Sequence, residues 1–254
     1  MLLVIDAGNT NITVGAFNGD DLVFVSRLAT DRTLTEDRIA IDINSIFALY
    51  NVESRSFRGS IISSVVPELT LALKNAIARI TGHTPYVVGP GLKTGLNIRT
   101  DNPAELGADL VAGAVGAIEQ YELPCLVIDL GTATKISVVD EKGAYRGCTI
   151  SPGVAISLAA LANGASQLSH IALLPPTHAI GTNTIDCMRV GSVFGTADML
   201  DGLCDRIEKE LDVPVKTIVA TGGLCAIAKH CRHEIVFNEN LLLEGLKAIY
   251  ERNQ

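Results

Sequence analysis

The alternation of apolar and polar residues predicts that the chain opens with three strands, a helix, a strand, a helix and a strand. The expected strands are short runs of Val, Ile, Leu and Phe that end at glycine or polar residues, and the expected helices carry apolar residues three and four positions apart. These elements are strands Leu2–Asp6, Asn11–Phe17, Asp21–Leu28, Gly59–Val65 and Tyr86–Val88, and helices from Thr35 to Tyr50 and from Pro67 to Thr81.

A similar order of elements returns after a helix of small apolar residues that begins at Pro103. The second set comprises strands Cys125–Asp129, Thr134–Val139, Ala144–Ile150, Thr217–Ala220 and Glu234–Phe237, helices Val154–Ala162 and Asn240–Tyr250, and a long helix capped by Gly181–Thr184 that ends near Leu211. Strands that alternate with helices indicate an α/β fold. We therefore predict two similar domains, residues 1–118 and 119–254, each with a mixed sheet flanked by helices.

Each half begins with the same short motif, an apolar strand that ends at Asp-x-Gly. Asp6 and Gly8 align without a gap with Asp129 and Gly131, and each glycine is followed by Asn or Thr residues. Backbone amides in such a turn bind anions, and a nearby carboxylate is a suitable ligand for Mg²⁺. One copy could be an ordinary hairpin turn. Two copies in matching positions favour two phosphate-binding turns that face a cleft between the halves.

Asp109 is the second chemical signal, because it lies among small apolar residues on a helix that we expect to be buried. A buried carboxylate must be paired or used in catalysis. Gly107 and Ala108 leave room for a ligand beside it. The alternative is that Asp109 caps a neighbouring element. Thr221-Gly222-Gly223, after a strand, is a further candidate for nucleotide contact, although an ordinary turn that binds no ligand could have the same sequence.

Composition limits the classes of partner. The net charge of −8 argues against nucleic acid or an anionic membrane as a partner, and no apolar run reaches the roughly 18 residues of a membrane span. The six cysteines show no Cys-x-x-Cys pair, so we expect reduced, mostly buried thiols and no zinc site. Because Met1 leads directly into a core strand, we expect no signal peptide and a cytoplasmic protein.

The order of motifs resembles the type III pantothenate kinase family, within the superfamily of actin, sugar kinases and acetate kinase. The resemblance covers nearly the whole chain and rests on eight blocks: Asp6–Thr10, Gly89–Leu96, Asp101–Asp109, Asp129–Thr134, Gly147–Gly153, Gly181–Thr184, Thr221–Gly223 and Leu241–Leu246. It implies two ribonuclease H-like, actin-like domains with an interdomain cleft. It also implies ATP-dependent phosphorylation of pantothenate, the first step of coenzyme A synthesis, with Mg²⁺ and a monovalent cation (K⁺ or NH₄⁺).

The same resemblance implies roles for individual residues. Asp109 would be the base that takes the proton of the acceptor hydroxyl, Asp129 would lie beside the monovalent cation, and Asp6 would reach Mg²⁺ through the phosphates. The residues expected to bind ATP or its phosphates are Asp6, Gly8, Asn9, Thr10, Asn11, Thr13, Thr132, Gly222 and Gly223. Those expected to bind pantothenate are Thr100, Gly107, Ala108, Asp109, Leu110 and Thr184. A homodimer would complete the acceptor site.

The chain departs from the family pattern at four positions. Leu110 replaces an arginine, Thr100 replaces a tyrosine, Lys135 replaces a threonine, and Val190, before Gly191, replaces a serine. Leucine cannot make the paired hydrogen bonds of a guanidinium. Three functions follow: a pantothenate kinase in which Lys135 or Arg189 supplies the missing cation, a catalytically impaired paralogue that binds or regulates, or a kinase of another small alcohol.

Overall fold

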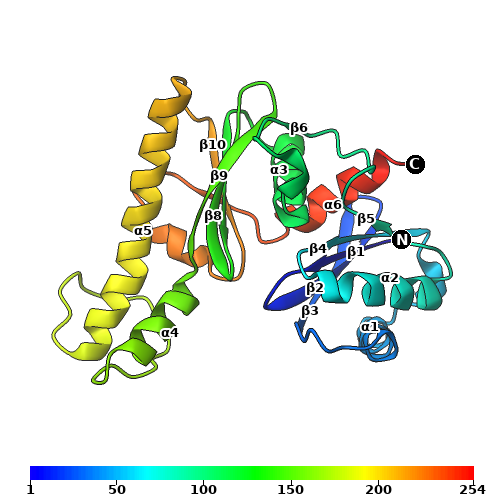
Figure 1. Cartoon of the computed structure of the whole chain (residues 1–254), viewed down its shortest axis with the longest axis horizontal. Coiled ribbons are helices and arrows are strands. Elements are labelled where there is room, and N and C mark those ends of the chain that lie inside the picture. Colours follow the sequence, from blue (N-terminus) through cyan, green and yellow to red (C-terminus); the bar gives the residue numbers. More distant parts are fainter. The chain divides into compact units, whose positions relative to one another are not determined.

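The computed structural model describes residues 1–254 and divides into two compact units, each built around one sheet (Figure 1). The first unit contains residues 1–96, 101–119 and 241–254, and the second contains residues 97–100 and 120–240. The α/β class and the mixed sheets flanked by helices are as the sequence predicts.

The sheet of the first unit has the strand order β3-β2-β1-β4-β5, in which β1 runs antiparallel to β2 and parallel to β4. Leu3, Ile5 and Ala7 of β1 pack with the apolar sides of α1 and α2 in one core. The elements of this unit are β1 Leu2–Ala7, β2 Asn11–Asn18, β3 Asp21–Ala29, α1 Glu36–Leu49, β4 Gly59–Ser64, α2 Pro67–Thr81, β5 Tyr86–Val87, α3 Ala108–Gln120 and α6 Leu241–Glu251.

The sheet of the second unit repeats this topology. Its order is β11-β10-β7-β8-β9-β6, so β7, β8, β9, β10 and β11 take the places of β1 to β5. Alternate residues Leu126, Ile128 and Leu130 of β7 pack with Leu200 and Cys204 of α5. The elements are β6 Asn97–Ile98, β7 Cys125–Leu130, β8 Ala133–Val139, β9 Ala144–Pro152, α4 Val154–Gly164, α5 Thr184–Leu211, β10 Thr217–Thr221 and β11 Val236–Phe237.

Several expected boundaries differ from the observed ones. Pro103 begins a three-residue 3₁₀ turn, and the helix α3 begins five residues later at Ala108. The loop at residues 89–102 contains the short strand β6, which pairs in parallel with β9. The segment after Thr221-Gly222-Gly223 contains a six-residue 3₁₀ helix, Cys225–His230. Two-residue strands and 3₁₀ turns leave too short a pattern to be recognised.

Helix α6 follows the second unit in the chain but belongs to the first, where it crosses α3 at glycine residues. A Cβ at Gly245 would overlap the carbonyl oxygen of Ala112, and one at Gly116 would overlap the carbonyl oxygen of Leu241. The other end of α6 is tied to α3 by an ion pair between Arg252 and Glu119. This contact explains why α3 consists of small residues. The predicted division into residues 1–118 and 119–254 does not anticipate the return of α6.

The six cysteines are free, as predicted, but they are not mostly buried. Cys125, Cys204 and Cys225 are buried, Cys231 is partly buried, and Cys148 and Cys187 are exposed. Burial raises the pKa of Cys125, Cys204 and Cys231 to about 12. No helix is both long and apolar enough to cross a membrane.

We predict that Gly245→Ala destabilises the protein by about 1–3 kcal/mol, because the added methyl group meets backbone that cannot move aside easily. Urea unfolding of the variant measures this loss. Gly202→Ala is the matched control, since Gly202 lies in α5 with open space around its Cβ position. This control is expected to gain about 0.5–1 kcal/mol from helix propensity. Equal effects in the two variants would contradict the close α3–α6 packing.

Candidate functional site

The first Asp-x-Gly turn closes at the carboxyl end of β1, as the sequence predicts. The amide of Gly8 donates to the carbonyl oxygen of Asn11 at 2.9 Å, and Asn9, Thr10 and Asn11 are exposed around this turn. Asp6 is half-buried at the strand end and lies opposite Thr13 of β2 and Ser63 of β4. The turn therefore presents hydroxyl and amide side chains beside one carboxylate, which suits a phosphate with its metal ion.

Two residues that the sequence analysis did not single out complete this turn. Thr30 donates its hydroxyl to the carbonyl oxygen of Gly8 at 2.7 Å, and Arg32 donates to the side-chain oxygen of Asn9 at 3.0 Å. Both follow β3, which runs parallel to β1 because each is antiparallel to β2. Their strand therefore ends at the same edge of the sheet as β1. In the sequence, these residues could have been found as a hydroxyl and a guanidinium side chain directly after that strand.

Asp109 lies in the first turn of α3, the helix that packs against α6. Gly15, opposite Val4, packs against Leu243 of α6, so α6 covers the face of the first sheet that carries Val4 and Asp6. A Cβ at Gly107 would lie 2.5 Å from Asp109 Oδ1 and 3.7 Å from Val65. Val65 follows β4 and donates its amide to Ala7 at the end of β1. Asp109 is therefore half-buried near the strand ends that carry Asp6.

In the second unit three segments meet at the end of β7. A Cβ at Gly153, directly before α4, would overlap the carbonyl oxygens of Gly131 and Thr132. A Cβ at Gly222, whose φ is +89°, would lie 2.7 Å from Asp129 Oδ1 and 2.8 Å from the carbonyl carbon of Leu130. Only glycine permits both this conformation and this approach. Gly222 thus lies beside Asp129, whereas Gly223 has open space around it.

The carboxylate of Asp129 already has a cationic partner within the protein. Lys135 Nζ lies 2.8 Å from Asp129 Oδ2, and the two side chains are only 15% and 19% exposed. Asp129 and Lys135 are opposite one another in the β7–β8 ladder. Arg189, the other candidate for a compensating cation, lies 3.5 Å from Asp186 and donates to the carbonyl oxygen of Ala172.

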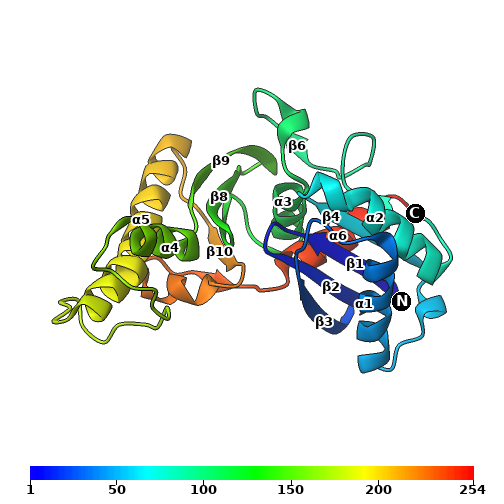
Figure 2. The same ribbon diagram turned by 60° about the horizontal axis from the view of Figure 1, so that its bottom comes forward.

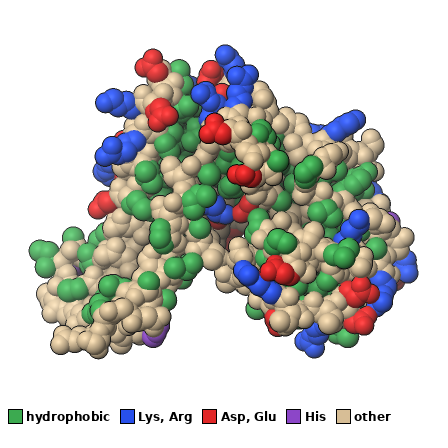
Figure 3. All heavy atoms as spheres, in the orientation of Figure 1, with side chains coloured by type: hydrophobic (Ala, Val, Ile, Leu, Met, Phe, Trp, Pro, Cys, Tyr) green, Lys and Arg blue, Asp and Glu red, His purple; other side chains and the backbone are tan.

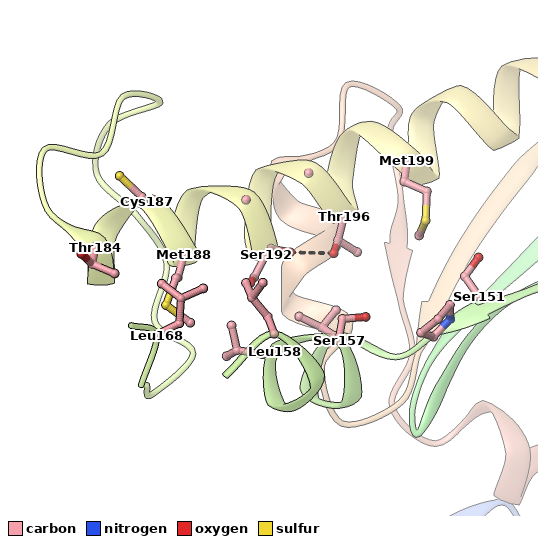
Figure 4. Close-up of a pocket in the computed structure, with 15 residues that line it drawn as sticks. Ser151, Ser157, Leu158, Leu168, Thr184, Cys187, Met188, Ser192, Thr196 and Met199 are labelled. Atoms are coloured by element: carbon pink, nitrogen blue, oxygen red, sulfur yellow. Dashed lines mark hydrogen bonds between the residues drawn. The ribbon is translucent and has the colours of Figure 1, made fainter. Parts of the chain in front are cut away.

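Thr184 is not part of this cluster. It is exposed at the start of α5 and lines an open groove of about 630 Å³ between α4 and α5 (Figure 4). The groove is mainly apolar, with Leu158, Met188 and Met199 along it, and its polar groups are hydroxyls such as Ser192. Thr100, another expected substrate residue, follows β6 and has a buried hydroxyl oxygen with no hydrogen-bond partner in the protein.

We predict that Gly222→Ala weakens binding of ATP, because its methyl group displaces Asp129 and forces an unfavourable φ. The expected loss of affinity is at least about tenfold, equivalent to about 1.4 kcal/mol. Isothermal titration with a non-hydrolysable ATP analogue and Mg²⁺ measures it. Gly143→Ala is the control, because Gly143 also has a positive φ of +74° but meets only Leu123. The control is expected to lose stability and to keep its affinity for the analogue.

Comparison with solved structures supports the fold. The chain is similar to a putative Baf family transcriptional activator from Campylobacter jejuni, with a TM-score of 0.62, 20% identity, and coverage of 99% of this chain and 98% of the other. It is also similar to a putative 2-dehydro-3-deoxygalactonokinase from Sinorhizobium meliloti, with a TM-score of 0.61, 13% identity, and coverage of 99% and 96%. These likenesses show the actin-like and sugar-kinase type of fold.

Comparison of sequences is more specific. A family model described as type III pantothenate kinase matches residues 2–206. Proteins named type III pantothenate kinase are 44% identical in Exiguobacterium sp. (strain ATCC BAA-1283 / AT1b) and 42% identical in Brevibacillus brevis, each over the full length of both chains. The order of motifs, the repeated sheet topology and the full-length similarity agree, and the chain belongs to the type III pantothenate kinase family.

Proposed function

We propose that this protein transfers the γ-phosphoryl group of ATP to pantothenate and so performs the first step of coenzyme A synthesis. The observation that carries this proposal is the position of Asp109 near Val65, whose amide bonds to Ala7 at the end of β1, where the first turn closes. A proton acceptor and a phosphate-binding turn on one rigid unit suit phosphoryl transfer to an alcohol, which depends mainly on positioning and charge neutralisation.

In this reaction the primary hydroxyl of pantothenate attacks the γ-phosphorus of ATP. The bond between the γ-phosphorus and its bridging oxygen breaks, the hydroxyl proton passes to Asp109, and ADP leaves. Gly107 keeps space beside the Asp109 carboxylate. Gly107, Ala108 and Leu110 are proposed to contact pantothenate. The family relationship and the half-burial of Asp109 support its role as the base.

Donor binding is assigned to both Asp-x-Gly turns. Gly8, Asn9, Thr10, Asn11 and Thr13 are proposed to contact the phosphates from the first unit. Thr132, Gly222 and Gly223 are proposed to do so from the second, where Gly153 and Gly222 hold the backbone of residues 129–132 in place. A cleft between the two halves and the domain division at residues 118 and 119 stay predictions.

Mg²⁺ is expected to arrive bound to ATP. The carboxylate of Asp6 at the end of β1 is an oxygen donor of the kind that completes a magnesium–phosphate complex. The metal would neutralise charge on the phosphates. The monovalent cation expected at Asp129 has no support from the geometry, because that carboxylate already contacts the ammonium group of Lys135.

The two alternative functions have less support. A regulatory paralogue or a kinase of another alcohol was suggested by Thr100, Leu110 and Lys135, yet full-length relatives at 40–44% identity carry the name of the pantothenate kinase. The unpartnered hydroxyl of Thr100 supports its contact with a polar acceptor. A cytoplasmic location is expected of an enzyme that uses ATP and makes a coenzyme precursor.

We predict that Asp109→Asn lowers the rate of pantothenate-dependent ADP release by about 10²–10⁴-fold, the usual contribution of general-base catalysis. Affinity for ATP should stay within the wild-type range, because the phosphate turns are unchanged. A coupled assay for ADP and a titration with an ATP analogue measure the two effects. Asp21→Asn, at an exposed carboxylate on β3, is the control. Wild-type turnover in Asp109→Asn would refute the assignment of the base.

We also propose a homodimer, in which a second copy covers the α4–α5 groove. No Asp, Glu, Lys or Arg occurs between Arg146 and Asp186. Figure 3 shows the corresponding end of the second unit with few charged side chains. Exposed aliphatic side chains gather there, and Ile180 is 81% exposed, an arrangement typical of protein–protein contacts. Thr184, in the same groove, would then lie at the interface, as expected of a residue that completes the acceptor site.

We predict that Ile180→Asp converts the dimer to a monomer and lowers the apparent affinity for pantothenate, because a charge would enter an apolar interface. Size-exclusion chromatography with light scattering measures the mass, and steady-state kinetics measure KM. Leu71→Asp on α2 is the control, because this leucine is 66% exposed in the first unit. A monomeric wild-type protein would contradict the proposed dimer.

A further inference from the structure

The residue paired with the motif aspartate across the sheet differs between the two halves of the molecule. Across β1 and β2, Asp6 lies opposite Thr13, whereas across β7 and β8 Asp129 lies opposite Lys135. The two strand pairs are otherwise equivalent in topology. One copy of the turn therefore faces its carboxylate with a hydroxyl and the other with an ammonium group.

One oxygen of the Asp129 carboxylate already has a cationic partner. Oδ2 is bonded to Lys135 Nζ at 2.8 Å, and Oδ1 lies beside Gly131 and Gly222, which bring no charge of their own. A K⁺ ion at this carboxylate would have to displace a tethered ammonium or accept a like charge next to it. The residues present therefore do not fit the monovalent cation that the family resemblance implies.

We propose that Lys135 is a built-in replacement for the monovalent cation, so that the enzyme works without K⁺ or NH₄⁺. An alkylammonium has the charge and the hydrogen-bonding character of NH₄⁺. Because it is covalently attached, its effective concentration at Asp129 is high and does not depend on the salt in solution. Lys135 acts here as a positioning residue, which neutralises Asp129 beside residues 131 and 132 of the phosphate-binding turn. The inference rests on the proposed kinase function.

The geometry of Lys135 separates this role from that of a surface lysine. Lys142, seven residues away, has a side chain that is 80% exposed and lies 4.0 Å from Glu141. Exposed ion pairs of this kind contribute little to the stability of a protein. The Lys135 side chain is 15% exposed and is held on a central strand of the sheet. Its position is therefore defined by the fold.

The experiment compares the wild type with Lys135→Thr in potassium chloride and in choline chloride at equal ionic strength. For the wild type we expect pantothenate-dependent ADP release to differ less than about twofold between the two salts. For Lys135→Thr we expect at least about a tenfold loss in choline and recovery in K⁺ or NH₄⁺, as for a site that has become dependent on a bound ion. Lys142→Thr, the control, should behave as the wild type does.

A second readout does not depend on turnover. The melting temperature of Lys135→Thr should rise by a few degrees, about the effect of a weakly bound ligand, when K⁺ replaces choline, while that of the wild type should not change. Activation of the wild type by K⁺ as strong as that of the variant would overturn the inference, as would a variant whose melting temperature ignores K⁺. If Lys135→Thr does not fold, Lys135→Gln is measured in its place. If neither variant folds, the salt response of the wild type tests the inference. A lack of turnover in every salt would refute the kinase function, and the melting temperatures would still test Lys135.

Discussion

Carboxylates at the ends of buried strands are the constraint on which this structure depends. Asp6 and Asp129 each follow apolar strand residues that pack into a core, and removing such a charge from water is costly unless it is paired. In the second unit Lys135 pairs with one oxygen of Asp129 at 2.8 Å. Gly153 and Gly222 lie close to the backbone of the same turn, so the paired carboxylate and the proposed phosphate-binding residues belong to one packed cluster.

The two halves show how one frame can carry different chemistry. The order of strands is the same, but the first turn is lined by Thr30 and Arg32 and the second by Gly153 and Gly222. Figure 2 shows the helices on their respective sheets from a second direction. In the first unit, the glycine-mediated contact of α3 with α6 carries Asp109 to the strand ends. The small residues of α3 therefore allow its close packing with α6, and this packing also fixes the position of Asp109.

Much of the fold and part of the site follow from the sequence. Strands with clear alternation or a continuous apolar run, such as Asn11–Asn18 and Cys125–Leu130, were predicted to within a residue or two. The two turns were found because the motif repeats. The start of α3 was placed too early, because Pro103 opens a 3₁₀ turn as readily as an α-helix. Thr30, Arg32 and the Lys135–Asp129 pair depend on strand neighbours and register, which a linear pattern does not contain.

The most direct test of the account is to identify the product. Purified protein is incubated with ATP, Mg²⁺ and pantothenate, and the mixture is examined by ³¹P NMR and mass spectrometry. The account predicts one phosphate ester of pantothenate for each ADP formed and no product without pantothenate. Release of free phosphate in place of the ester, or no change in pantothenate while ATP still binds, would contradict it.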